Sequence, residues 1–166
     1  MRPARPVAVA LLLMVAAIIL QTTLFARLRP FGVAPDLVLL LAILSAHFVP
    51  AEASLLLGFT GGLLMDLLGS TPLGLRGLTF TVVAYAAVRT RDRSEHGVLT
   101  RSAWVALLTL GGIALFLLVG TLFGQAILLG GSLVGSLVLI PLYNVMLGLA
   151  AAPLMARVLR AESPRP

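Results

Sequence analysis

Apolar segments follow one another along almost the whole chain, and only short polar connections separate them. Hydrophobic residues make up 60% of the sequence and charged residues only 11%, which is too apolar for a soluble domain with a polar surface. A helix needs about 20 apolar residues to cross a hydrocarbon core ~30 Å thick. We therefore predict an all-α integral membrane protein with about six transmembrane helices in one domain, residues 1–166. The predicted spans are 7–26, 36–49, 53–69, 75–88, 102–123 and 133–156.

The predicted spans differ in length. The second, 36–49, is short for a full crossing unless it is tilted, lies in a thinned bilayer or is re-entrant, and 75–88 is short as well. The first apolar run is longer than the ~7 to 15 residue core of a signal peptide, and no convincing cleavage site follows it. We interpret it as an uncleaved first span, and we expect the tail 161–166 to be disordered.

The arginines are distributed unevenly between the two predicted sides of the membrane. With six spans, nine arginines lie on the side of both termini and of the connection 89–101, and three, at 27, 29 and 76, lie on the other. The positive-inside rule then places both termini in the cytoplasm. No aromatic residues are interleaved with the arginines, so we expect membrane lipids and no nucleic acid as partners. Trp104, next to the basic connection, is predicted to sit at the lipid headgroups.

One helical face of the third span carries small residues and an acid. Counting in steps of four from Ser54 gives Gly58, Gly62, Asp66 and Ser70, which share a face of a helix. Close backbone approach at glycine and buried polar contacts contribute much of helix association in lipid. We predict that this face packs on other helices, either of the same chain or of a partner.

Two acids are predicted to lie towards the outer side. An ionised carboxylate costs roughly 2.5 to 3.5 kcal/mol at the bilayer centre and less near an interface, so Asp66 needs a partner or a wet cavity. Asp36 directly precedes an apolar run, where an acid can cap a helix. Because three arginines fall on the same side, we also hypothesise that one of them pairs with an acid.

The sequence offers no catalytic constellation that intramembrane enzymes require. It has no cysteine and two histidines; His96 is expected to be solvated, and His47 to lie near the cytoplasmic end of the second span. Asp36 and Asp66 would have to face each other at a water-accessible point to act as an acid pair, and the Gly-x-Gly-Asp context of intramembrane aspartyl proteases is missing. We expect no enzymatic activity, no metal and no cofactor.

Several stretches resemble the rod shape-determining protein MreD family. They are QTTLF at 21–25, PDLVLLLAI at 35–43 and GFTGGLLMDLLGSTPLGLRGLTF at 58–80. The most specific part is Gly-Leu-Leu-x-Asp at 62–66, followed by Pro-Leu-Gly at 72–74. A late Asn144 followed by Pro153 is also similar to the family, so the resemblance covers nearly the whole chain. The sequence departs from the family's pattern at 76–77, where Arg-Gly replaces a small or apolar pair.

The resemblance implies a non-catalytic scaffold of the bacterial elongation machinery in the cytoplasmic (inner) membrane. Proteins of this kind work with MreC, which links the MreB filament to RodA and a penicillin-binding transpeptidase, in cell shape and lateral peptidoglycan synthesis. It also implies a fold similar to the S component of energy-coupling-factor transporters. The residues we expect to carry helix packing or partner contact are Gly58, Gly62, Asp66, Pro72, Gly74, Asp36 and Asn144.

The fold similarity suggests an alternative function, the substrate-binding membrane subunit of a vitamin-type transporter. A vitamin site needs several convergent polar or aromatic groups, whereas this chain has 6% aromatic residues and few polar residues expected near Asp66. An orphan helical bundle that only stabilises other proteins cannot be distinguished from the scaffold by sequence. The sequence also leaves open whether a lipid or small molecule occupies an outer cavity.

Overall fold

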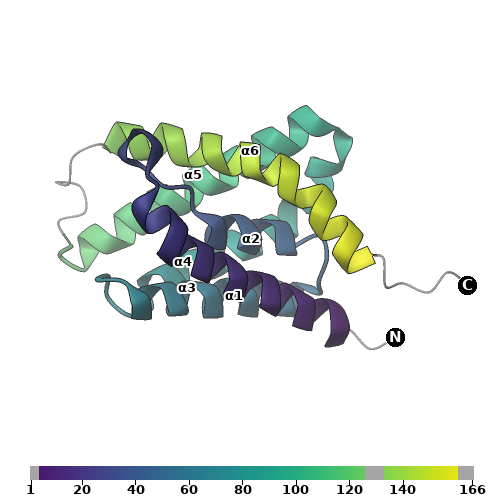
Figure 1. Cartoon of the computed structure of the whole chain (residues 1–166), viewed down its shortest axis with the longest axis horizontal. Helices are drawn as coiled ribbons and strands as arrows, with labels where there is room; N and C mark the ends of the chain where they lie inside the picture. Colours follow the sequence, from purple (N-terminus) through teal and green to yellow (C-terminus); the bar gives the residue numbers. More distant parts are fainter. Residues whose placement is uncertain (1–3, 126–132, 161–166) are drawn as a thin grey trace, which may run out of the picture.

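The computed structural model describes residues 4–125 and 133–160, and this part of the chain is helical without any strand (Figure 1). Two short 3-10 helices, η1 (Pro30–Gly32) and η2 (Arg91–His96), lie in the connections. The predicted all-α fold is confirmed, and the predicted disordered tail lies outside the described residues. The α-helices are α1 (Ala4–Arg27), α2 (Leu37–Ser45), α3 (Ala51–Leu68), α4 (Leu75–Thr90), α5 (Val98–Leu122) and α6 (Leu133–Arg160).

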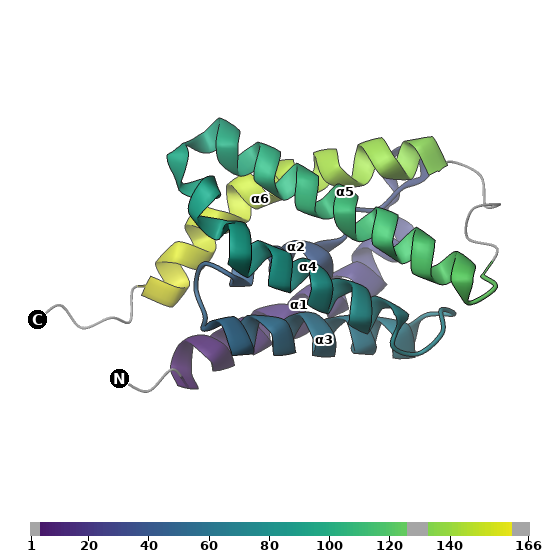
Figure 2. The ribbon, with the colours of Figure 1, turned by 180° about the vertical axis from the view of Figure 1, so that it is seen from behind.

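Helix α2 forms the centre of the bundle. It contacts each of the other five α-helices, and Figures 1 and 2 show it enclosed between them. Seven of its nine residues are buried. Its residues are apolar on every side up to Ser45, as in a helix covered on every side, and at nine residues it is too short to face lipid across a bilayer.

The six α-helices of the described part of the chain differ in their ability to span a bilayer. Helices α1, α3, α5 and α6 each contain a stretch long and apolar enough to cross a membrane. In contrast, α2 has nine residues and α4 has 16, so they extend only about 14 and 24 Å at ~1.5 Å per residue. The two segments that the sequence marks as short are therefore the two short helices of an integral membrane protein.

The connections fall into two groups at opposite ends of the bundle. The start of α1, the end of α6, the connection 46–50 and η2 lie at one end, here called the terminal end (Figures 1 and 2). The connections 28–36 and 69–74 lie at the other end, here called the loop end. The two ends therefore separate the connections into the same two groups that the sequence predicts for the two sides of a membrane.

Trp104 is buried between helices at the terminal end, so its predicted position at the lipid headgroups is wrong. Only 6% of its surface is exposed. Its indole Nε1 donates a 2.8 Å hydrogen bond to the hydroxyl of Thr90 at the end of α4, and the edge of its ring packs on His47, 4.9 Å away between ring centroids. A buried indole is stable where its N–H has an acceptor, and α4 supplies one.

Candidate functional site

The small-residue face of α3 packs inside the chain. A Cβ atom added to Gly58 would lie 2.8 Å from the carbonyl oxygen of Phe80 in α4, and one added to Gly62 would lie 2.5 Å from another α4 carbonyl oxygen. Further along this face, the hydroxyls of Ser54 and Ser45 are 2.7 Å apart and join α3 to α2. The glycines therefore let two backbones touch, and α4 covers the surface that a partner helix would otherwise use.

Asp66, at the end of this face, caps a neighbouring helix. The residue before α4 is Gly74, which has no side chain to cap the helix and adopts a left-handed conformation with φ 91°. Oδ2 of Asp66 instead accepts hydrogen bonds from the amides of Arg76 at 2.9 Å and Gly77 at 3.5 Å. Oδ1 accepts a 2.8 Å bond from the hydroxyl of Thr71. A carboxylate from α3 thus satisfies unpaired amides of the first turn of α4.

Of the three arginines predicted on the outer side, Arg76 is the one that lies beside an acid in the described part of the chain. Its Nε is 3.9 Å from Oδ1 of Asp66, and this nitrogen is buried and makes no hydrogen bond within the described part of the chain. The guanidinium carbon lies 5.3 Å from the centre of the Phe116 ring in α5, a cation–π distance. The hypothesised acid–arginine pair therefore exists, but the amides and the hydroxyl make the closer contacts to Asp66.

The turn between α3 and α4 borders an apolar cavity. Pro72 and Gly74 line it together with Leu78 of α4, Val119 of α5 and Phe123, and its volume is about 220 Å³. Leu78 is 50% exposed and Phe123 is 70% exposed. The two turn residues that the sequence singles out thus lie at an open apolar hollow between α4 and α5.

Asp36 caps the central helix, as the sequence predicts for an acid at this position. Its Oδ1 accepts a 3.0 Å bond from the amide of Leu39. Gln21 of α1 completes the cap, because its Oε1 accepts bonds from the amides of Leu37 at 2.8 Å and Val38 at 3.2 Å. Among the ion pairs of the described residues, none involves Asp36. The carboxylate of Asp36 and the side-chain amide of Gln21 therefore cap the start of α2 together.

Asn144 joins this cap to two further helices. The side chain is fully buried, its Oδ1 accepts a 3.2 Å bond from the amide of Asp36, and its Nδ2 donates a 3.4 Å bond to the hydroxyl of Thr109 in α5. The sequence singles out Asn144 through the family resemblance alone and does not identify Thr109 or Gln21 as site residues. The available signal for Gln21 was an amide inside an otherwise apolar predicted span.

A second, larger cavity opens at the loop end, with a volume of about 450 Å³. The side chains of Gln21, Arg29, Asp36, Arg76 and Ser136 contribute to its lining. This lining is more polar than the sequence led us to expect. Asp66 does not line this cavity, and only 2% of its surface is exposed. Asp36 and Asp66 therefore do not meet at a water-accessible point.

The chemistry of these groups is that of holding helix ends. Both oxygens of Asp66 accept hydrogen bonds from the adjoining turn and helix, and Asp36 accepts from its own helix. Within residues 4–125 and 133–160, no group of three or more His, Cys, Asp or Glu side chains is arranged to hold a metal ion. The starts of two capped short helices, α2 and α4, therefore form part of the loop end.

Comparison with known families identifies a matching family model. The family model described as rod shape-determining protein MreD matches residues 1–160. No curated protein and no solved structure matches the chain.

Proposed function

The chain belongs to the MreD family of rod shape-determining proteins, and we propose that it is a non-catalytic membrane scaffold of the bacterial elongation complex. Membership of this family implies a role in determining rod shape. The proposal adds that the chain binds MreC directly and, through it, acts with MreB, RodA and a penicillin-binding transpeptidase in lateral peptidoglycan synthesis. The observation that carries it is the family match over nearly the entire sequence.

The use of the buried polar groups supports a scaffold. Asp36 and Asp66 are the acids that an aspartyl-type site would require, and Asn144 is a buried amide beside one of them. Each of the three accepts a hydrogen bond from the chain's own backbone. These contacts fix helix ends, and the buried Asp66 does not reach the loop-end cavity that Asp36 lines, so the two acids do not form a pair that could act on a substrate. These contacts fix the starts of α2 and α4 at the loop end. A scaffold needs such fixed helix positions to present a surface to a partner.

We place the contact with MreC on α4 and α5 near the turn 69–74. The glycine face of α3 is covered by α4, so a partner helix has to use another surface. The apolar cavity beside Pro72 and Gly74 opens between exposed side chains, since Leu73 is 68% and Leu78 50% exposed. A hollow of about 220 Å³ can take one large apolar side chain of a single partner helix, giving the close packing on which helix association in lipid depends.

The proposed orientation puts the terminal end in the cytoplasm. Nine of the twelve arginines belong to the predicted side of the termini, which is the cytoplasmic bias of inner-membrane proteins. Since the chain has no cysteine, single cysteines at Asp92 and Leu73 report each end without interference. A membrane-impermeant maleimide applied to spheroplasts is expected to label Leu73→Cys and to spare Asp92→Cys until the membrane is permeabilised. The reverse pattern would invert the topology.

The first test of the scaffold is purification of the tagged protein from its own membranes in mild detergent. Recovery of MreC with the glycosyltransferase and transpeptidase pair is the expected result. Recovery of a transmembrane coupling subunit with two ATPases would overturn the scaffold and indicate a transporter.

Disulfide crosslinking locates the contact. Leu78→Cys and Phe123→Cys are expected to crosslink to cysteines placed along the transmembrane helix of MreC. Leu12→Cys is the matched control, because Leu12 is 70% exposed on α1, which does not line the cavity. Equal or stronger crosslinking from Leu12→Cys would refute the proposed contact face, but it would not contradict the proposal that MreC is the partner.

A further inference from the structure

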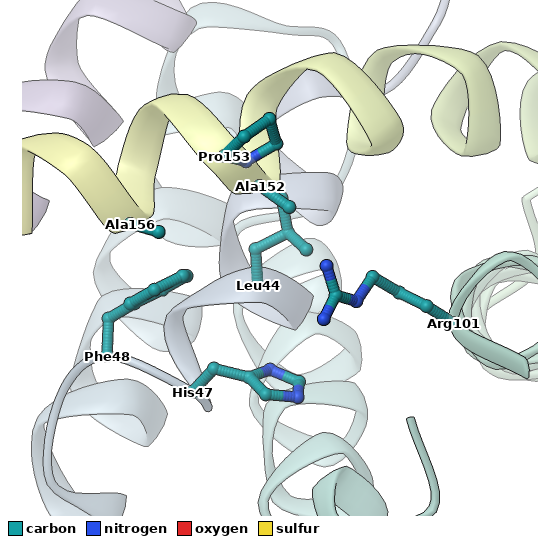
Figure 3. A pocket seen from close by; sticks show the side chains of 7 residues that line it. All are labelled: Leu44, His47, Phe48, Arg101, Ala152, Pro153 and Ala156. Atoms are coloured by element: carbon teal, nitrogen blue, oxygen red, sulfur yellow. The ribbon is translucent and has the colours of Figure 1, made fainter. Parts of the chain in front are cut away.

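A separate cavity lies at the terminal end, where α2, α5 and α6 meet. Its volume is about 240 Å³. Figure 3 shows Leu44 and Phe48 on one side, Ala156 and neighbouring residues of α6 above them, and two basic side chains, His47 and Arg101. None of the loop-end groups described above contributes to it. The cavity therefore combines an apolar wall with positive charge at the most basic end of the molecule.

Arg101 supplies the positive charge in this cavity. The side chain extends from α5 towards Leu44 and His47 (Figure 3), and within the described part of the chain no carboxylate lies within ion-pair distance of it. Arg101 is the fourth residue of α5. Gly97, the residue before this helix, provides no side-chain cap, and the first turn holds no acid. A cation beside the positive end of a helix dipole is unfavourable on its own, so an anion bound here would interact favourably with both.

The ring of His47 is a fixed part of the wall. Its Nε2 is 2.6 Å from the hydroxyl of Ser94, and that hydroxyl donates its own hydrogen to the carbonyl oxygen of Arg91, also at 2.6 Å. The hydrogen between the ring and Ser94 therefore belongs to Nε2. The rings of His47 and Trp104 also pack in an edge-to-face arrangement, so two contacts hold the imidazole in its position in the wall.

The size and the position of the cavity limit the kinds of ligand that it can bind. A volume of 240 Å³ corresponds to about eight water molecules at ~30 Å³ each, which suits a small anion with a few attached carbon atoms and is too small for a large ligand. Arginine recognises phosphate through two parallel N–H bonds. The surrounding arginines at this end, such as Arg91 and Arg157, raise the local concentration of anions.

We propose that this cavity binds a phosphate group, that of an anionic phospholipid, with Arg101 as its ligand. The apolar wall formed by Leu44, Phe48 and Ala156 would contact the glycerol and the first acyl carbons, which a free phosphate ion lacks. Lipid therefore explains both halves of the lining, the cation and the hydrocarbon surface. The inference does not depend on the partner proposed above.

The test is native mass spectrometry of the full-length protein in detergent, titrated with phosphatidylglycerol or with zwitterionic phosphatidylcholine. We expect a preference for phosphatidylglycerol, and at least about tenfold weaker binding for Arg101→Gln, which removes one or two charge-assisted hydrogen bonds. Arg89→Gln is the matched control, because Arg89 lies at the same end but stacks on Tyr85 outside the cavity. Equal weakening of phosphatidylglycerol binding by both variants would show that the effect comes from general surface charge, and it would refute the proposed site.

A second variant and a second ligand complete the test. Ala156→Phe fills the apolar side of the cavity without changing any charge, and it is expected to weaken phosphatidylglycerol binding as well. Unchanged binding by this variant would refute the cavity as the site. Millimolar inorganic phosphate is expected to leave the lipid adduct in place; displacement of the lipid by phosphate alone would assign the cavity to a free anion instead.

Discussion

Replacing Asp66 with asparagine tests whether a carboxylate from α3 holds the start of α4. The substitution keeps the shape of the side chain but removes the charge that accepts two close hydrogen bonds, from Thr71 at 2.8 Å and from the amide of Arg76 at 2.9 Å. A hydrogen bond to a charged group contributes about 1 kcal/mol more than a neutral one, so the expected loss is about 2 kcal/mol. Alanine removes both acceptors and leaves buried donors unpaired, with an expected loss of about 3 to 4 kcal/mol.

The assay is thermal unfolding of the purified protein in one detergent. At about 2–4 °C per kcal/mol for a chain of this size, Asp66→Asn should lower Tm by about 4–8 °C, and Asp66→Ala by more. Asp92→Asn is the control, since the Asp92 side chain is 93% exposed and its loss should change Tm by no more than about 1 °C. If the Tm values of Asp66→Asn and Asp92→Asn were equal, the cap would contribute nothing and the reasoning would be refuted.

Three further substitutions and one control test the packing and the turn. Gly62→Ala should destabilise the protein by about 1–3 kcal/mol through overpacking against α4, whereas Gly111→Ala, with nothing within 4 Å of its added Cβ, should be neutral or stabilising in the same unfolding assay. Asn144→Ala should cost about 1–3 kcal/mol, because the partly buried amide of Asp36 loses its acceptor; an unchanged Tm would exclude that bond as a stabilising contact. Gly74→Ala should cost about 1 kcal/mol at its left-handed φ of 91°, measured as a drop in Tm, and no drop would show that the turn relaxes freely.

Much of the architecture follows from local signals in the sequence. Uninterrupted apolar runs specify the number and kind of the helices, and the acid before Leu37 specifies a cap, because capping depends only on residues within one turn. The short run that follows Asp36 also predicts a helix that is short for a full crossing. These predictions hold because each depends on neighbours in the chain and on nothing distant.

Contacts between distant helices could not be predicted in the same way. The spacing of Gly58, Gly62 and Asp66 indicates a packing face, but it cannot identify α4 as the helix that covers it. Trp104 illustrates the same limit, since an indole beside a basic connection is typical of a membrane interface, and only the position of Thr90 in space turns it inward. Gln21 carries no local signal beyond its polarity, because its partners lie 16 and 17 residues away.

The two acids and the two short helices are linked by one physical requirement. A helix leaves its first amides unpaired, and in a long membrane helix water or headgroups can satisfy them at the surface. Helices α2 and α4, with nine and 16 residues, begin at partly buried positions of the loop end, where an unpaired amide is costly. Each therefore begins beside a carboxylate. Asp36 directly precedes α2 and caps it, and Asp66 of α3 caps α4. A short apolar run in a membrane protein thus predicts a nearby acid with a structural role, and this favours capping over catalysis for both.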